Sequence, residues 1–258
     1  MAQDAPLRIA HGFGNSRELV RVALENDIDV VEADVRLRGD ALRLGHDQRL
    51  PLLPVLLDRR PLSPPLPPKP SLSFGPWQVR LDIHALSLEE LLAMVAGRCR
   101  LLLDLKHPRK ASDVPRFVEN LVGLLRQFQL AGETYLCGDW PLLDEARRQG
   151  SESAVYYSVA DRSRWQALVC RIEDGEKMAG VSLRSTLLDS QTAGFLRDNG
   201  VRVFSWPVDD RAEAARVLKL GVDGIISNDL AILAASAPAR SVDEWADAKQ
   251  ECARGEAD

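Results

Sequence analysis

The chain has 258 residues, of which 45% are hydrophobic and 28% are charged, and its formal net charge at pH 7 is −5. These proportions are those of a soluble globular protein, and the length suits one barrel domain or two smaller domains. Acidic residues outnumber basic ones, so the composition shows no excess of positive charge, which argues against nucleic acid as a partner. It does not exclude a substrate that carries phosphate, because a bound cation dominates the field of such a site.

The cysteines and the N-terminus predict the compartment. The four cysteines (Cys99, Cys137, Cys170 and Cys252) are scattered, and no pair has the spacing of metal ligands. Such usage is typical of reduced thiols in a cytosol. Residues 1–7 have neither the basic start nor the apolar core of a signal peptide, and no run approaches a membrane span. We expect a cytoplasmic protein with no stable membrane insertion.

Strand-like and helix-like segments alternate along the chain, which is the pattern of a parallel α/β fold. The predicted strands cover residues 7–10, 29–37, 41–45, 101–106, 134–137, 154–159, 180–183, 201–206 and 224–227. The predicted helices cover residues 16–26, 114–130, 141–149, 163–172, 189–199 and 212–220, with a further helix that Ser87 begins and Glu90 completes as a capping box.

This alternation predicts a TIM (β/α)8 barrel over residues 1–235, with a short helix or frayed tail over 236–258. There are nine candidate strands for eight places, so either one of these strand predictions is wrong or one strand lies outside the barrel. Gly39 and Asp40 predict a tight turn between the second and third candidates. No helix fits there, so we expect a hairpin-like excursion. Asp209 and Asp210 are interpreted as a helix N-terminus rather than as catalytic carboxylates.

Residues 51–78 form a proline-rich insertion after the third predicted strand. Its nine prolines exclude a helix or a central strand. It is interpreted either as a semi-rigid surface excursion or as a lid that selects substrate, because long loops in compact domains are often functional. Its apolar residues would suit a lipid tail.

Acidic residues follow apolar runs in two of the predicted strands. Glu32 and Asp34 lie two apart, so both point to the same face of their strand. Asp104 and Lys106 repeat this spacing. Such residues can be surface acids or a buried ion pair without function. Together, however, the three carboxylates predict ligands for one divalent cation, Mg²⁺ or Ca²⁺, and Lys106 would hold a phosphate oxygen.

Two of the four histidines, His11 and His46, also end apolar runs. A single histidine at a strand end is more often structural. A pair near acidic residues suits the acid and base of phosphodiester cleavage, in which one removes a proton from the attacking hydroxyl and the other protonates the leaving alkoxide. His84 and His107 are interpreted as bystanders.

In this order, the clusters resemble the motifs of the glycerophosphodiester phosphodiesterase family. That family carries H-R-G, E-x-D, H-D, E-x-K, a tryptophan strand and the ending G-V-D-G-I-I-T-D. The corresponding residues here are His11-Gly12, Glu32-Ala33-Asp34, His46-Asp47, Asp104-Leu105-Lys106, Trp206, and Gly221 to Asn228. The resemblance implies a metal-dependent phosphodiesterase in which Trp206 forms a wall of the pocket. A neighbouring hydroxyl of the substrate would attack and give a cyclic phosphate.

The chain departs from the family motifs at several positions. Gly12 stands where the family has arginine, so the bidentate phosphate clamp is missing. We assign Gly12 and Arg184 to the substrate-binding residues, with Arg184 or Arg36 as the replacement for that arginine. Asp104 stands where the family usually has glutamate.

These departures leave three hypotheses. The first is hydrolysis of a small glycerophosphodiester or a lysophospholipid. The second is a sphingomyelinase D-like phospholipase, because those toxins also lack the arginine and use D-x-K; menorin-like proteins, in the same superfamily, resemble residues 15–35. The third is a catalytically silent barrel that binds a phosphorylated ligand, against which the retained histidines, acids and Lys106 argue.

Overall fold

The computed structural model describes residues 5–45, 56–59, 71–75, 77–80 and 86–236. Its main sheet is a closed barrel of eight parallel strands, in the order β1, β12, β11, β10, β9, β8, β7, β2, with β2 pairing back to β1. These strands are β1 (Leu7–Ala10), β2 (Val30–Arg38), β7 (Arg100–Leu105), β8 (Thr134–Gly138), β9 (Ala154–Val159), β10 (Gly180–Arg184), β11 (Arg202–Trp206) and β12 (Gly224–Ser227). The predicted TIM barrel is confirmed.

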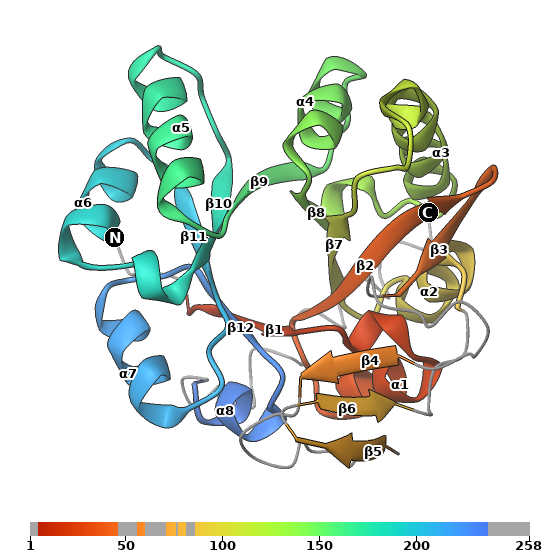
Figure 1. Ribbon diagram of the computed structural model, residues 1–258, viewed down its shortest axis with the longest axis horizontal. Coiled ribbons are helices and arrows are strands. Elements are labelled where there is room, and N and C mark those ends of the chain that lie inside the picture. Colours follow the sequence, from red (N-terminus) through yellow and green to blue (C-terminus); the bar gives the residue numbers. More distant parts are fainter. Residues whose placement is uncertain (1–4, 46–55, 60–70, 76, 81–85, 237–258) are drawn as a thin grey trace, which may run out of the picture.

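Helices surround this ring of strands (Figure 1). They are α1 (Arg17–Glu25), α2 (Leu88–Val95), α3 (Val114–Gln127), α4 (Trp140–Arg148), α5 (Arg162–Glu173), α6 (Ser190–Asp198), α7 (Arg211–Lys219) and α8 (Leu230–Ala235). The capping box at α2 is confirmed, since the Ser87 side chain accepts from the Glu90 backbone and Glu90 accepts from that of Ser87. Helix α3 ends three residues earlier than predicted, because Gln129 has the left-handed φ of 57°. No helix among the described residues is long and apolar enough to cross a membrane.

The ninth predicted strand is β3 (Ala41–Leu44), which pairs antiparallel with the end of β2 and lies outside the barrel. Gly39, at the turn between them, has a φ of +62°, a conformation that glycine adopts without strain. The predicted hairpin is confirmed.

A second, three-stranded sheet follows β3 in the chain. It consists of β4 (Leu56–Arg59), β5 (Ser71–Phe74) and β6 (Trp77–Arg80), antiparallel and in the order β4, β6, β5. The sequence analysis missed these strands, because each has four residues and prolines separate them. Its exclusion of a central strand is wrong for β6, which lies between β4 and β5 and itself contains no proline. The rest of the proline-rich insertion and the tail over 236–258, apart from Ser236, lie outside the described residues.

Strand alternation divides the core into two layers. One face of the strands packs against the helices, and the other fills the barrel with the side chains of Ile9, Val30, Leu102, Cys137, Tyr156, Phe204 and Ile226. Tyr156 and Phe204 stack with ring centroids 4.1 Å apart. The barrel is therefore packed at this level, and inward side chains further along the strands lie at the carboxyl end, where barrel enzymes place their sites.

Candidate active site

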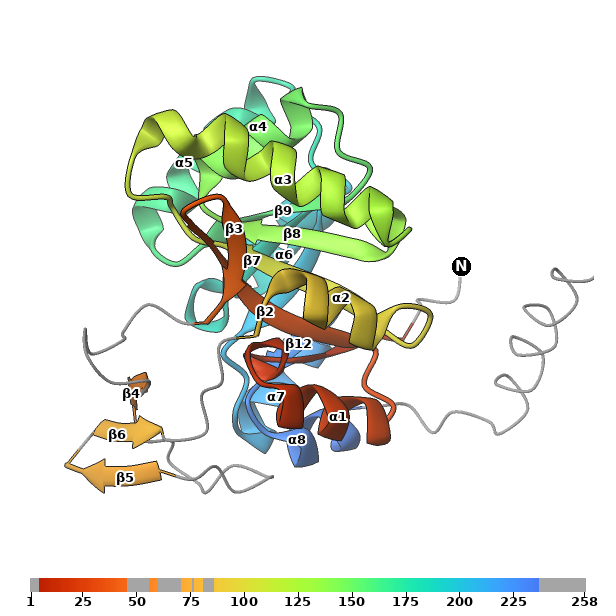
Figure 2. The same ribbon diagram turned by 90° about the vertical axis from the view of Figure 1, so that its right-hand side faces the viewer.

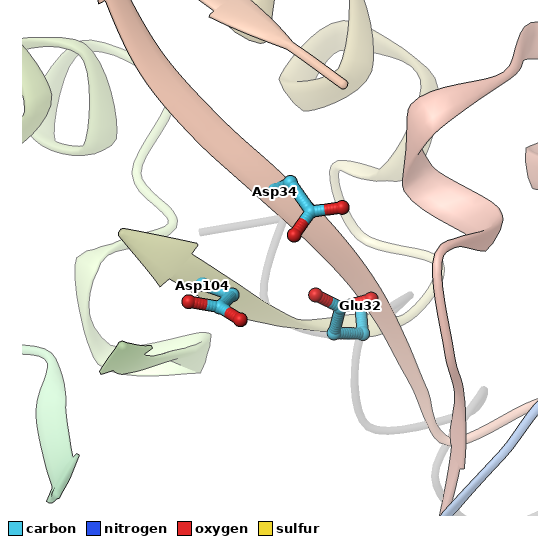
Figure 3. A group of neighbouring side chains, drawn as sticks. All are labelled: Glu32, Asp34 and Asp104. Carbon is cyan, nitrogen blue, oxygen red and sulfur yellow. The ribbon is translucent and has the colours of Figure 1, made fainter. Parts of the chain in front are cut away.

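Three carboxylates converge above the packed interior of the barrel. Strand alternation carries the inward face from Val30 to Glu32 and Asp34 on β2, and from Leu102 to Asp104 on β7. Asp34 and Asp104 are register partners on these neighbouring strands. Figure 3 shows the three carboxylates gathered at one place, and each offers an oxygen within 4.8 Å of the others. The structure thus brings together the three acids that the sequence analysis grouped.

Lys106 lies between two of these acids. Its Nζ is 2.7 Å from Asp34 Oδ1 and 2.6 Å from Asp104 Oδ2. One ammonium group therefore faces three carboxylates, and the cluster keeps a formal charge of −2 when all of them are ionised. The sequence spacing placed Lys106 on the same face as Asp104 but gave no sign of its contact with Asp34.

Backbone and amide groups from the segment after β1 bind the acids of β2. The Gly12 backbone N–H donates to Glu32 Oε2 at 2.5 Å. Asn15 donates from Nδ2 to Asp34 Oδ2 at 2.7 Å, and its Oδ1 accepts from the Asp34 backbone N–H at 3.0 Å. Glu32 and Asp34 are both buried, so these bonds fix their orientation.

The surroundings change how readily the cluster ionises. Burial raises the pKa of Glu32 well above its usual value, and repulsion from Asp34 and Asp104 raises it further. Burial also raises the pKa of Asp104, with Lys106 opposing and Asp34 adding to the shift. Burial by itself would lower the pKa of Lys106, but Asp104 and Asp34 outweigh it and raise that pKa. Lys106 is therefore charged at neutral pH.

The donor set fits a divalent cation. Three buried or partly buried carboxylates on two adjacent strands supply oxygen donors, the kind that Mg²⁺ and Ca²⁺ prefer. Their remaining negative charge would be costly to bury without a cation among them. Glu32, Asp34 and Asp104 are thus the residues that would hold it.

Gly138 has no side chain, and the Asp104 carboxylate occupies the space that a side chain there would fill. A Cβ atom built at Gly138 would lie 2.3 Å from Asp104 Oδ1 and 2.4 Å from the Leu105 carbonyl oxygen, and φ at this residue is +105°. Both the close approach and the left-handed φ require glycine. The sequence analysis missed the role of this residue. The only available signal was that a glycine directly follows the strand predicted over residues 134–137.

The imidazole of His11, which directly follows β1, is hydrogen-bonded to a side-chain amide. Its Nδ1 is 3.0 Å from Asn228 Oδ1. Asn228 in turn donates from Nδ2 to Asp209 Oδ2 at 3.1 Å, and from its backbone N–H to Asp209 Oδ1 at 2.8 Å. Because the amide nitrogen is turned to Asp209, its oxygen faces the imidazole, so we infer that His11 carries a proton on Nδ1 and keeps Nε2 for chemistry.

This network corrects part of the sequence interpretation of Asp209 and Asp210. Asp210 caps helix α7 by accepting from the Glu213 backbone N–H at 2.8 Å, as predicted. Asp209 instead orients Asn228. Neither Asn228 nor Asp209 was predicted to act near His11, because the residues of the imidazole–amide contact are 217 positions apart in the chain.

Of the other three histidines, only His107 lies within the described residues. His46, the predicted partner of His11, lies outside the described residues, as does His84. His107 pairs through Nδ1 with Asp139 Oδ1 at 3.0 Å, and half of its side chain is exposed. No bond of His107 to the carboxylate cluster is present among the described residues.

No protein-family model and no curated protein matches the sequence. Solved structures do match the fold. Two glycerophosphodiester phosphodiesterases superpose over most of their length. The enzyme from Parabacteroides distasonis has 20% identity and a TM-score of 0.63, covering 88% of this chain and 94% of that one. The enzyme from Thermotoga maritima has 18% identity and a TM-score of 0.62, covering 87% of this chain and 95% of that one. A phosphodiesterase of Oleispira antarctica in complex with the product sn-glycerol-3-phosphate also superposes, with 18% identity and a TM-score of 0.64, covering 90% of this chain and 96% of that one.

The chain has the glycerophosphodiester phosphodiesterase fold. At these identities the likeness concerns the fold, and the site must be argued from the residues of this chain. Within this fold, the carboxylate cluster on β2 and β7 and His11 on β1 lie at the carboxyl ends of adjacent strands.

Of the remaining predicted residues of this glycerophosphodiester phosphodiesterase fold, Arg184 and Trp206 lie at the ends of other strands, whereas Arg36 lies on β2. Arg184 and Trp206 end β10 and β11, where they are register partners, and the guanidinium carbon lies 5.8 Å from the centroid of the indole. Trp206 Nε1 is buried and has no hydrogen-bond partner among the described residues. Arg36 donates from Nε to the Gly45 carbonyl at 3.2 Å. No contact joins Arg184 to the carboxylates in the described part of the chain.

Proposed function

We propose that the protein is a metal-dependent phosphodiesterase that hydrolyses glycerophosphodiesters or lysophospholipids. The observation that carries this proposal is the convergence of Glu32, Asp34 and Asp104 around Lys106 at the carboxyl end of the barrel. The fold neighbours support it, and one of them binds sn-glycerol-3-phosphate, the product half of such a substrate. The cytoplasmic location and the absence of a nucleic-acid partner stay predictions from the sequence.

The cation would be Mg²⁺ or Ca²⁺, held by the three acids. When bound, it polarises the phosphoryl oxygens and offsets the charge that builds on them. Lys106 assists from within the cluster. An ammonium group has three N–H donors, and the bonds to Asp34 and Asp104 occupy two of them. The third is available to hold a phosphate oxygen.

His11 and His46 are the proposed acid and base. His11 Nε2 takes a proton from the attacking hydroxyl or gives one to the leaving alkoxide, and His46 does the reverse. The bond from Nδ1 to Asn228 supports this role for His11, since it fixes the ring and its tautomer. The substrate hydroxyl next to the phosphate would attack, and water would open the resulting cyclic phosphate.

Arg184 and Trp206 are the proposed substrate-binding residues on the opposite arc of the barrel. Arg184 would replace the arginine missing after His11, where Gly12 offers its backbone N–H to Glu32 instead. The indole ring would form a wall of the pocket. The Trp206 N–H has no partner among the described residues, which supports this role, because a buried donor gains most from a ligand that accepts a hydrogen bond from it.

A second candidate is a phospholipase of the sphingomyelinase D-like kind. It uses the same residues but takes a lipid substrate. The exposed apolar side chains of β5 favour this candidate, and the missing arginine is compatible with it. A silent phosphate-binding barrel would have little use for an oriented histidine beside three acids.

Hydrolysis of a substrate panel, with and without EDTA, tests the proposal. The panel contains glycerophosphocholine, glycerophosphoethanolamine, lysophosphatidylcholine and a chromogenic bis-aryl phosphodiester. We expect turnover that EDTA abolishes and Mg²⁺ or Ca²⁺ restores, and the preferred substrate separates the two candidates. If no member is turned over with either metal present, the silent binding barrel is favoured.

A further inference from the structure

Two large apolar side chains of β5 are exposed. Leu72 is 63% and Phe74 53% accessible, and no other large hydrophobic residue in the described part of the chain is so exposed. They lie two positions apart on one strand and therefore point to the same face. Isolated apolar residues on a surface are ordinary, but two on one face of a small sheet form a patch that can mark an interaction site.

Cross-strand register extends this patch. Leu72 is the partner of Val79 and Phe74 is the partner of Trp77 on the antiparallel neighbour β6, and such partners lie on the same face of a sheet. We call these four residues the apolar face. Ser73 alternates with them on β5 and is exposed on the other face. Strands β5 and β6 are thus amphipathic, and none of their described side chains belongs to the barrel core.

The insertion that carries this sheet is anchored beside the carboxylates. The Gly45 backbone N–H, where the chain leaves β3, donates to the Asp34 carbonyl at 3.0 Å. The returning chain is held at the same place, since the Leu44 N–H donates to the Leu86 carbonyl at 3.1 Å. Both views show the small sheet standing outside the ring of barrel strands (Figures 1 and 2). It therefore projects from the rim of the candidate active site.

The charge of this segment differs from that of the chain. Residues 56–80 contain four basic residues (Arg59, Arg60, Lys69 and Arg80) and one acidic residue (Asp58), whereas the whole chain has a net charge of −5. Two of these basic residues, Arg59 and Arg80, belong to strands of the small sheet itself. A segment whose sequence combines basic residues with leucine, phenylalanine and tryptophan has the composition of segments that bind anionic lipid surfaces. Aromatic side chains also favour the membrane–water interface.

A second copy of the chain fits this surface less well. Two exposed side chains offer at most a few hundred Å², whereas a stable dimer buries on the order of 1,600 Å². A symmetric contact would also bring the two basic segments together, which costs electrostatic energy. Shallow insertion into a lipid headgroup region needs no such area.

We propose that the apolar face docks the protein reversibly on an anionic lipid surface. Docking places the candidate active site beside the headgroups, so the substrate would be a phosphodiester presented at a lipid–water interface. This statement about substrate rests on the proposed function, whereas the docking itself does not. Peripheral contact of this kind agrees with the expected lack of stable membrane insertion.

Flotation with vesicles of phosphatidylcholine, alone or mixed with phosphatidylglycerol, tests the docking. The full chain should float with the mixed vesicles, and added salt should weaken this binding. Replacing both Leu72 and Phe74 by serine should lower the partition coefficient by about a hundredfold, since each buried side chain is worth about one decade. Failure of the wild type to float, or equal flotation of the variant, would overturn the proposal.

Matched variants of the same strands provide the controls. Ser73→Ala, on the other face of β5, should float like the wild type, and Phe74→Trp should keep the binding. Circular dichroism shows whether the double variant folds, and the single variants Leu72→Ser and Phe74→Ser replace it if it does not. Sedimentation velocity that reveals a dimer broken by these changes would make the face an interface between copies and overturn the lipid assignment. Flotation requires no turnover, so hydrolysis of glycerophosphocholine measured on the same samples tests the proposed chemistry separately.

Discussion

The two sides of the barrel mouth hold their polar residues in different ways. On the β2–β7 side, three carboxylates share one lysine and retain negative charge. On the β1–β12 side, His11 meets a neutral amide whose remaining hydrogen bonds go to Asp209, exposed at the surface. The first side is electrostatically incomplete without a cation, whereas the second is satisfied by the protein alone. Variants on the two sides should therefore respond differently to metal.

The largest effect is expected on the acidic side. Asp104→Asn removes a cation ligand, and activity should fall by about 10⁴-fold because the stabilisation of phosphoryl charge by metal is worth several kcal/mol. Isothermal titration with Mg²⁺ and Ca²⁺ should show weakened binding in parallel. If activity fell while metal affinity stayed at the wild-type level, Asp104 would not be a ligand.

The next effect is expected at the histidine. His11→Ala should lower activity by about 10³-fold, which lies within the range of general acid–base catalysis, and leave metal binding unchanged. His107→Ala is the matched control and should keep its activity, since His107 pairs with Asp139 and makes no bond to the cluster among the described residues. Equal losses in the two variants would contradict the assignment of His11.

Gly138→Ala tests the packing behind the acids. The new Cβ would crowd Asp104 Oδ1 and require a left-handed φ, so the free energy of unfolding should drop by roughly 2–4 kcal/mol. Gly123→Ala, within α3 where nothing lies near the added Cβ, should be neutral or stabilise by up to about 1 kcal/mol. Urea denaturation measures both, and an unchanged Gly138→Ala stability would refute the close approach.

Asn228→Ala removes the orienting amide without touching any acid. We expect the turnover rate to fall about tenfold, as for other residues that orient a functional histidine, with KM unchanged. Proton NMR of the imidazole should then report a mixture of tautomers. A change in metal affinity in this variant would contradict the prediction, because it would show that the two sides of the barrel mouth are not independent.

The smallest effect expected is a pH dependence of stability in the metal-free protein. The pKa values of Glu32 and Asp104 are raised on folding, so their contribution is fully present below the unfolded carboxylate range of about 4 and is lost as pH rises through the folded values. In EDTA, Tm should fall by a few degrees between mildly acidic and neutral pH. Glu32→Gln should flatten this dependence, and saturating Mg²⁺ or Ca²⁺ should remove it. A Tm that rises over the same pH interval would contradict the raised pKa values of Glu32 and Asp104.

Much of the barrel was predictable because it rests on local periodicity. The spacing of Glu32 and Asp34, and of Asp104 and Lys106, fixed the shared face of each pair before any contact was known. The turn at Gly39 likewise indicated that the strand over 41–45 would fold back on its neighbour. The small sheet was not predictable in this way, because strands of four residues between prolines carry too little alternation.

The sequence by itself determined which residue types stand at the ends of the strands, since strand periodicity and motif order are properties of the chain. Only the tertiary structure decided their partners. Closure of the barrel places Asn228 against His11, sets Lys106 between Asp34 and Asp104, and brings Gly138 against Asp104. Most of these contacts join strands far apart in the chain, and their geometry follows from register and packing, which no local pattern encodes.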